Sequence, residues 1–551
     1  MSTLLLDAEH SDVHLKLVEE LLGWQRSGML IIDGWEDQLR RELYGVAAGR
    51  VGDATIVMGL YDVTGHRGNA ETVLKTAKTA MADMGITNAS PFLAAVTDNP
   101  NVMKCFRKML EKEFPWLITL ACWAHGLNTL IGEICRYADA KREIKRANRV
   151  VTFFNGSHYW GGQLKTTAAA EGVNRGLKKN CESRWYALIL LLRSILSHRT
   201  PLITLVARED ACHAAKGLSA VNEDVIRTVR DPDDTFWPMV SQTVRIAQPF
   251  VDAIALCEGR AATLGECMLN LVEAARQLSL LKDERKDDIG FKEHAYQVVD
   301  KRFRNPSSPS RSFPPSVVSQ TSRALDIAKN KWKWPKSMCK LLLLDLVEYH
   351  GCREPWNGGD RDLREWWKRL SVSAEKHPLK PFAMAINSIC PHSAEIERLF
   401  SACNGIQSAK RNSLGVDTFS KLAKIRSKLV EEAKSHIPAK KTKVVQQKSQ
   451  VMPLSTRMTA ANSPPLGPDS AQPSKTFDED LWDAPLEGDE DDGEEATERA
   501  FAQLEETLDA EKEDEDSEQA AEDTPPENAD SDEELPERLK VGGKKKKKSP
   551  S

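Results

Sequence analysis

Two aspartates and one glutamate stand where carboxylates can do chemistry. Asp33 ends an apolar run in IIDGW, Asp98 ends another in VTDNPN, and Glu397 lies in SAEIERLF. Neighbouring strand ends can bring two aspartates within metal-bridging distance, and divalent cations such as Mg²⁺ prefer oxygen ligands. If the glutamate's helix packs on the same sheet, the three acids suit a pair of Mg²⁺ ions about 3.5–4 Å apart that catalyse phosphoryl transfer. We therefore predict Asp33, Asp98 and Glu397 as catalytic and metal-binding residues.

Each acid also has a simpler interpretation. An Asp at a strand end is often a turn former or a helix N-cap. The apolar positions 396, 399, 400 and 403 follow the spacing of one helix face, and Glu397 falls on the edge of that stripe. A glutamate there is commonly solvated or held in a structural ion pair. The residues alone leave both interpretations open.

The elements that must position these acids follow from hydrophobic periodicity. We predict strands at 29–33, 43–48, 55–63, 92–98 and 116–123, and helices at 12–27, 69–85, from about 99 to 112, and 125–137. The run at 92–98 is almost continuously apolar, which is typical of a strand buried on both faces. The order βββαβαβα fits a mixed sheet with helices on both sides.

Charge divides the chain into a basic body and an acidic tail. Residues 477–540 contain 29 acidic and 4 basic residues, so that residues 1–476 carry a net charge of +15 although the whole chain carries −5. A basic body is expected of a nucleic-acid binder, although many other proteins share it. The tail has too few apolar groups to offset the entropy of ordering, so we predict that it is disordered.

Five separated motifs occur in one order along the chain. They are DGW at 33–35, TDNPN at 97–101, CWAH at 122–125, SRW at 183–185, and SAEIERLFSACNGIQSAKRNSL from 393. In these motifs the chain resembles the hAT-type DNA transposases, in particular the branch whose catalytic half is classed as a domain of unknown function. The resemblance covers about residues 25–432, and its last motif is the most specific.

The resemblance implies an RNase H-like core, a large all-helical insertion before the last catalytic helix, and a C-terminal segment that forms homodimers. It places the family's catalytic acids on Asp33, Asp98 and Glu397. The tryptophans that hold a flipped base in relatives fall on Trp35 and Trp185, and Arg184 becomes a phosphate or base contact. Indole faces suit this role because stacking recovers part of the cost of flipping. Without the resemblance, we would interpret both tryptophans as core aromatics, because they lie beside apolar runs.

The family's Cys-x-x-His pair falls on Cys122 and His125. We expect no zinc there, because the sequence offers no second pair at a suitable spacing. We take His125 as a DNA contact or as a hydrogen-bonding residue at the edge of the site, and Arg398, next to the predicted catalytic glutamate, as a further DNA contact. The aromatic and basic runs KWKW at 331–334 and EWWKRL at 365–370 fit a DNA channel or ordinary helix packing.

Together these observations predict an α/β fold with an RNase H-like mixed five-stranded sheet. The expected parts are an N-terminal helix at 1–28, the first part of the core at 29–185, an all-helical insertion at 186–380, the dimerisation segment at 381–434, and a disordered tail at 435–551. The helix expected near 419–429 has an apolar face that suits a partner surface or the closing of its own core.

The predicted function is that of a transposase-derived, homodimerising DNA-binding protein, with metal-dependent strand cleavage and transfer as its reaction if it is active. The alternative is an inactive, domesticated relative that serves as a dimerisation scaffold. The basic runs at 439–443 and 544–548 resemble nuclear-import signals, so we expect a nuclear protein. No apolar run is long enough to span a bilayer, so no membrane partner is expected. We expect no BED zinc finger, because the residues before the first strand lack a set of metal ligands.

Overall fold

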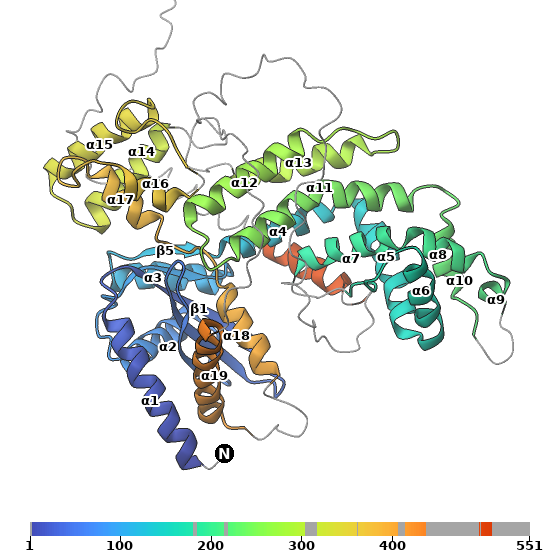
Figure 1. Cartoon of the computed structure of the whole chain (residues 1–551), viewed down its shortest axis with the longest axis horizontal. Helices are drawn as coiled ribbons and strands as arrows, with labels where there is room; N and C mark the ends of the chain where they lie inside the picture. Colours follow the sequence, from blue (N-terminus) through green and yellow to red (C-terminus); the bar gives the residue numbers. More distant parts are fainter. Residues whose placement is uncertain are drawn as a thin grey trace, which may run out of the picture.

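The computed structural model describes residues 3–179, 184–213, 219–303, 317–360, 362–405, 414–436, 495 and 497–509. Figure 1 shows a body that contains the sheet, joined to a long array of helices. Residues 180–183, which include Ser183 of the SRW motif, and residues 406–413 of the last motif lie outside the described part. Both predicted nuclear-import signals also lie outside it.

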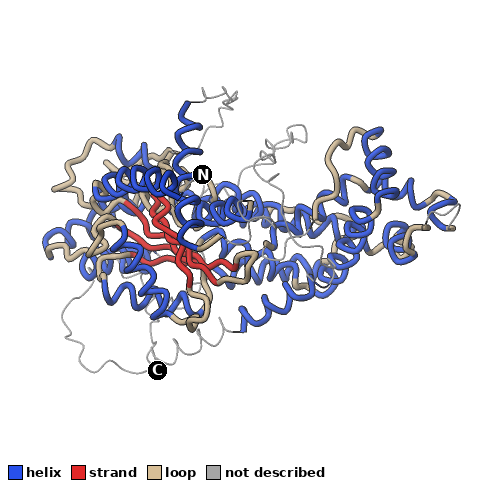
Figure 2. The backbone as a smooth tube through the Cα atoms, turned by 90° about the horizontal axis from the view of Figure 1, so that it is seen from below, coloured by secondary structure: helices blue, strands red, loops and turns tan. Residues whose placement is uncertain are grey.

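A five-stranded mixed sheet forms the centre of the body, as the sequence predicts. Its strands are β1 (Gly28–Glu36), β2 (Glu42–Gly49), β3 (Ile56–Asp62), β4 (Phe92–Thr97) and β5 (Ile118–Ala121), in the spatial order β3-β2-β1-β4-β5. The pairs β1/β2 and β2/β3 are antiparallel, whereas β1/β4 and β4/β5 are parallel. This order and these directions are consistent with an RNase H-like fold, and Figure 2 shows helices around the sheet.

Two layers of helices cover the sheet. One hydrophobic cluster joins α1 (Thr3–Leu22), α2 (Ala70–Asp83) and α3 (Asn101–Glu113) to one face. A second cluster joins α4 (Trp123–Cys135) and α18 (Ala394–Asn404) to the other face and continues into the helical array. All six residues of β4 are buried, as expected for a strand covered on both sides. The covering helices therefore hold both faces of β1 and β4 rigidly.

The last core helix, α19 (Val416–His436), packs along β3 and α1. Its side chains Phe419, Ala423 and Ile425 are buried in this contact, while Leu429 is 50% exposed and Val430 is 38% exposed. Most of the apolar face of α19 thus closes the chain's own core, which was one of the two interpretations of this helix. Dimerisation through 381–434 stays a prediction.

The remaining helices form the array seen in Figure 1. They are α5 (Ala138–Gly156), α6 (His158–Ala170), α7 (Trp185–Ser197), α8 (Arg199–Val206), α9 (Glu209–Cys212), α10 (Glu223–Arg230), α11 (Phe236–Cys257), α12 (Leu264–Ser279) and α13 (Ile289–Phe303). A smaller group follows: α14 (Val317–Asp326), the π-helix η1 (Ile327–Lys331), α15 (Lys336–His350), α16 (Leu363–Arg369) and α17 (Leu379–Ile386). A large helical part is confirmed, but α5 and α6 of this array precede residue 186, where the insertion was predicted to begin.

The tryptophans of KWKW and EWWKRL pack within the smaller group. Trp332 and Trp334 both contact Phe382, with ring centroids 5.2 and 6.1 Å apart respectively. Trp367 is buried and packs on Trp356 at 5.9 Å. These contacts favour helix packing, the simpler of the two interpretations, over a DNA channel.

Residues 497–509 form a helix, called here the tail helix, inside the segment predicted to be disordered. Its side chains Ala500, Phe501, Leu504 and Leu508 are buried in the same cluster as α4, α5 and α7. Figure 1 shows the tail helix in red beside α7. The predicted absence of packed structure beyond residue 435 is therefore wrong for these thirteen residues, because their apolar side chains share one face of a helix. The other residues between 437 and 551 lie outside the described part, apart from residue 495.

Across the described residues, no single helix has the length and apolar character needed to cross a bilayer. The bent pair α7 and α8, at 61° to each other, meets those criteria only when the two helices are taken together.

Candidate active site

Strand register places Asp33 and Asp98 side by side. Ile31 pairs with Val96 and Ile32 pairs with Thr97 along the parallel β1/β4 ladder. One residue further on, this register brings Asp33 opposite Asp98. Asp98 directly follows β4, whereas Asp33 lies three residues before the end of β1. Because side chains alternate between faces, Asp33 lies on the face of Ile31, and Asp98 on the face of Val96. Ile31 and Val96 belong to the cluster that α4 and α18 cover, so both acids lie beneath those helices.

A glycine lets α18 approach these acids. Gly45 on β2 pairs directly with Asp33. A Cβ atom built on Gly45 would lie 2.6 Å from Phe400 Cε1 and 2.9 Å from Ile396 Cδ1, so any larger residue there would force these side chains or α18 to shift. Ile396 and Phe400 thus rest on the backbone of β2. Glu397, on the same helix, is thereby brought to the edge where Asp33 lies.

The three acids influence one another electrostatically. Burial raises the pKa of Asp33 well above its usual value, and the charges of Asp98 and Glu397 raise it further. Burial also raises the pKa of Asp98, with Glu397 adding to the shift and with His125 and Arg107 opposing it. Coulomb energies fall with distance, so this mutual effect requires the carboxylates to be near one another. The structure therefore gathers the three sequence-predicted acids at one edge of the sheet.

Glu397 is also held by residues of the protein. Its Oε2 accepts a hydrogen bond of 3.0 Å from Arg184 Nη2, and its Oε1 accepts one of 3.3 Å from the Ser393 hydroxyl. Arg184 in turn donates to the Tyr186 hydroxyl at 2.8 Å. Across the residues that the structure describes, no three His, Cys, Asp or Glu side chains are arranged to hold a metal ion together. The third carboxylate is thus committed to an arginine in this conformation.

The surroundings of Asp98 fit a divalent cation. Arg107 fixes the turn after β4, because its guanidinium donates to Thr97 Oγ1, to the Asp98 carbonyl and to Asn99 Oδ1, each at 2.7 Å. The Oδ1 atom of Asp98 is buried and has no hydrogen-bond partner among the described residues. A buried carboxylate oxygen without a donor is costly, and the pKa values of both acids stay raised although Arg107, His125 and Arg184 oppose the shift. Carboxylate oxygens are the donors that Mg²⁺ prefers, so Asp33 and Asp98 suit it.

Replacing Asp33 with Asn is expected to stabilise the metal-free protein at neutral pH. The pKa of Asp33 is higher in the folded than in the unfolded chain. The favourable contribution of Asp33 to the free energy of unfolding is therefore complete at low pH, and it is lost as the pH rises through the pKa of the folded state. We expect Asp33→Asn to raise the Tm by about 2–4 °C at pH 8 with EDTA, for a gain of about 1 kcal/mol. The difference should shrink at pH 4. Thermal unfolding measures it, with exposed Glu36→Gln on the same strand as the control, and a lower Tm for Asp33→Asn at pH 8 would contradict the raised pKa.

Both predicted base-stacking tryptophans pack against other side chains of the protein. Trp35 is half-buried and stacks on Phe400 of α18, with ring centroids 5.2 Å apart and planes 12° apart. Trp185 is 8% exposed and lies against Gly132 of α4 on one side and Phe501 of the tail helix on another. In this conformation both act as packing aromatics, and their role in binding DNA stays a prediction.

Cys122 and His125 lie close to the acids but differ in accessibility. Cys122 is buried, and burial raises the pKa of its thiol to about 12, to which the charge of Glu397 contributes. The Ser393 hydroxyl lies 3.4 Å from the Cys122 Sγ, so the buried thiol contacts the residue that precedes α18 and helps to hold that helix in place. His125 is exposed and lies near enough to Asp98 to lower that carboxyl's pKa. His125 is therefore placed to meet a ligand that approaches the acids.

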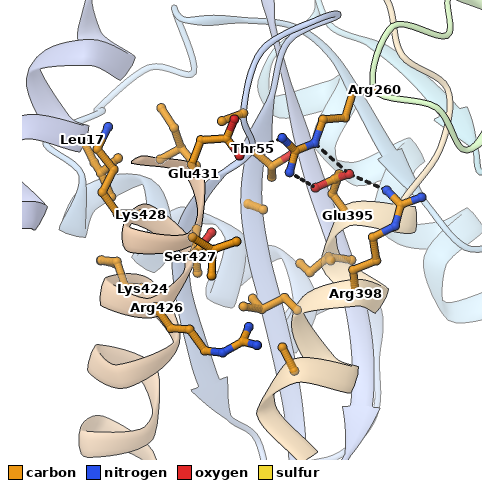
Figure 3. A pocket seen from close by; sticks show the side chains of 18 of the residues that line it. Leu17, Thr55, Arg260, Glu395, Arg398, Lys424, Arg426, Ser427, Lys428 and Glu431 are labelled. Carbon is orange, nitrogen blue, oxygen red and sulfur yellow. Dashed lines mark hydrogen bonds and ion pairs between the residues drawn. The ribbon is translucent and has the colours of Figure 1, made fainter. Parts of the chain in front are cut away.

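Arg398 points toward a separate cavity of about 180 Å³ between α18, α19 and the β2/β3 edge (Figure 3). Figure 3 shows Arg398 and Arg260 reaching the same carboxylate, that of Glu395. Arg260 also pairs with Glu431 of α19 at 2.8 Å. This network ties the α11–α12 connection to the two core helices. The structure thus gives Arg398 a structural partner, and its predicted contact with DNA stays a prediction.

Lys424, which also lines this cavity, is expected to cost stability. Its side chain is 5% exposed, and burial lowers its pKa to about 8. The unfolded chain binds this proton more tightly, so the stability of the native protein should rise as the pH increases from 8 to about 10.5. We expect Lys424→Met to stabilise the protein at pH 7 by about 3 kcal/mol, because each pKa unit corresponds to about 1.4 kcal/mol. Denaturant unfolding at pH 7 and pH 10 measures this, with Lys428→Met, whose native side chain is 26% exposed, as the control. An unchanged pH profile would contradict it.

Sequence reasoning missed several residues at the site. Arg107, which fixes the Asp98 turn, sits on the helix after β4, where a basic residue carries no distinctive signal. Glu258 follows α11, and burial together with the charge of Glu397 raises its pKa to about 7. Nothing in the sequence connects Glu258 to the motifs, because 139 residues separate it from Glu397. Ser393 opens the last motif, and its bond to Glu397 follows the helical i, i+4 spacing.

Comparison with known families bears on the N-terminal part of the chain. Residues 1–150 match the family model described as a domain of unknown function (DUF659). This domain occurs in hAT-like transposase-derived proteins. The match contains β1 through β5 with Asp33 and Asp98, while Arg184 and Glu397 lie beyond it. No curated protein matches the chain significantly.

Proposed function

We propose that this protein is a transposase-derived DNA-binding protein whose RNase H-like site can cleave and join DNA strands with divalent cations. The observation that carries the proposal is the strand register that brings Asp33 and Asp98 together, with Glu397 electrostatically linked to both. The DUF659 match supports the same origin. The cofactor we propose is a pair of Mg²⁺ ions, with no zinc.

Each residue of the site has a distinct proposed task. Asp33 and Asp98 would hold the cations, which activate the attacking oxygen and stabilise the leaving one in phosphoryl transfer. Glu397 would join them after leaving Arg184. Arg184, freed in this exchange, would be available to a DNA phosphate, which a guanidinium recognises with paired hydrogen bonds. His125 lies exposed beside Asp98 and would contact the same strand.

The proposed partner is DNA, bound without strong sequence preference. The net charge of +15 on residues 1–476 supports it, since phosphate contacts dominate non-specific affinity. Nuclear localisation and homodimerisation through residues 381–434 belong to the same proposal. The exposed Leu429 and Val430 at the end of α19 are apolar groups that such a contact would cover.

The second candidate is a catalytically inactive scaffold. It is favoured by the ion pair between Arg184 and Glu397, which neutralises the third acid inside the protein. If Glu397 never leaves Arg184, the protein would keep a stable fold but would lack the third carboxylate of the active site. The two candidates differ in whether cations can draw Glu397 away from Arg184.

DNA binding is expected to be salt-dependent and insensitive to sequence. Fluorescence anisotropy with two duplexes of unrelated sequence should give Kd values that agree within about threefold at 50 mM salt, and that weaken at least tenfold by 200 mM salt. Light scattering on the same samples should give the mass of a dimer. A dimer that binds neither duplex at 50 mM salt would reject the first candidate and favour the scaffold. A monomer that binds DNA would reject dimerisation alone.

A further inference from the structure

The tail helix docks through one apolar face. Phe501, Leu504 and Leu508 follow the helical i, i+3, i+7 spacing and are buried against the helical array. The Phe501 ring lies 4.8 Å from that of Trp185 on α7, and the ammonium group of Lys141 on α5 lies 4.7 Å from the same ring. One aromatic side chain thus anchors the tail between two helices of the body.

A buried polar contact fixes the register of this docking. Asn148 Nδ2 on α5 donates to Thr497 Oγ1 at 2.8 Å, and both residues are buried. Buried polar groups are costly unless they are hydrogen-bonded, so a shift of the tail helix along its axis would carry the cost of breaking this buried bond. The helix is therefore seated at one position and does not merely lie on an apolar surface.

Acidic residues of the tail helix meet cations of the body. Glu498 pairs with Lys145, and Glu505 lies 3.8 Å from Arg136 and 4.0 Å from Lys141. The carboxylates keep about half of their surface exposed, so each pair is screened and contributes little affinity. Their effect is to offset part of the positive charge of these three cations and to orient the helix.

The docked helix lies next to the candidate active site. Trp185, which Phe501 covers, directly follows Arg184, the partner of Glu397. The tail helix also carries Glu506 and Asp509, which are exposed. A nucleic acid approaching Arg184 across α5 and α7 would therefore meet carboxylates in place of the cations beneath them.

We propose that the tail helix is an intramolecular cap that competes with DNA for the surface formed by α4, α5 and α7. This inference rests on the proposed DNA-binding function. The cap covers Trp185 and places Glu498 and Glu505 against Arg136, Lys141 and Lys145. DNA can use these groups only when the tail helix leaves. The protein is thereby held in a state of low DNA affinity.

The experiment compares two variants of the full chain that have the same charge. Phe501→Ser with Leu504→Ser removes the apolar anchor, whereas Ala502→Ser with Gln503→Ser changes exposed positions of the same helix and serves as the control. Hydrogen exchange of residues 497–509, measured by mass spectrometry, reports docking. Anisotropy with a duplex at 100 mM salt reports DNA affinity.

The expected result is protection of residues 497–509 in the native chain and in the control, and loss of protection in the anchor variant. The anchor variant should bind DNA at least about tenfold more tightly, because three phosphate-binding cations are released. A synthetic peptide of residues 495–511 added to this variant should weaken its DNA binding again, whereas a scrambled peptide should not.

The other outcomes separate the cap from the proposed function. Absence of protection in the native chain would overturn the cap whatever the DNA result. Loss of protection with unchanged DNA affinity would overturn competition while leaving DNA binding intact. If protection is lost as expected but no form binds DNA, the proposed function fails and the competition fails with it, although docking of the tail helix stands.

Discussion

Supercoiled plasmid incubated with the protein and Mg²⁺ or Mn²⁺ is expected to be nicked, and Asp98→Asn is expected to slow nicking by about 10³-fold. The amide cannot supply the anionic oxygen that the buried position of Asp98 offers. Loss of a cation that contributes about 4 kcal/mol to the transition state corresponds to that factor. Gel analysis of open-circle formation over time measures the rate. The folded state should survive, because the substitution removes charge repulsion at the site.

Asp62→Asn is the matched control for this experiment. Asp62 is exposed at the end of β3, two strands from Asp33 in the sheet. The control should nick at the native rate, and EDTA should stop nicking by the native protein. Nicking that continues at an equal rate in Asp98→Asn would contradict the assignment of the site. An intact dimer with no nicking under any condition would favour the scaffold.

Gly45→Ala is expected to cost about 2–3 kcal/mol and to remove cleavage activity, because overpacking of a close contact has costs of this size. The added Cβ would lie 2.6 Å from the ring of Phe400, so either α18 or its side chains must move. Movement of α18 displaces Glu397, and movement of Phe400 disturbs the stacked Trp35. Thermal unfolding should show a fall in Tm of about 5–10 °C.

A double variant tests the cause of this loss. Leu at position 400 is smaller than Phe at the point of contact. Phe400→Leu by itself should lower stability, but in the chain that carries Gly45→Ala it should restore part of the lost stability. The two substitutions should therefore show a coupling energy of at least about 0.5 kcal/mol. Gly162→Ala is the control, since a Cβ there meets no atom within 4 Å. Additive effects of the two substitutions would show that α18 does not rest on Gly45 as described.

Local sequence patterns were enough to predict the sheet and the placement of two acids. The runs at 92–98 and 29–33 are apolar because β4 and the start of β1 are buried, and each aspartate marks the point where burial ends. Parallel pairing of β1 and β4 then makes their proximity a consequence of topology. The last motif identified Glu397 as a candidate residue. The approach of its helix to the sheet, however, depends on Gly45, which lies about 350 residues earlier in the sequence.

Contacts between distant segments could not be predicted in the same way. The ion pair between Arg184 and Glu397 joins two motifs, and the hydrophobic periodicity of neither motif predicts this contact. The tail helix was missed because a net charge count over residues 477–540 hides the short apolar stripe formed by Phe501, Leu504 and Leu508. That stripe was visible at helical spacing, and a scan in short windows would have found it.

We propose that Asp33 and Asp98, joined by Glu397, bind divalent cations at the sheet edge. Crystals grown with Mn²⁺ and measured for anomalous scattering test it most directly. We predict anomalous peaks between Asp33 and Asp98, and a Glu397 side chain that has left Arg184 to reach them. Maps without a peak at this edge, with Glu397 still bound to Arg184, would contradict the claim.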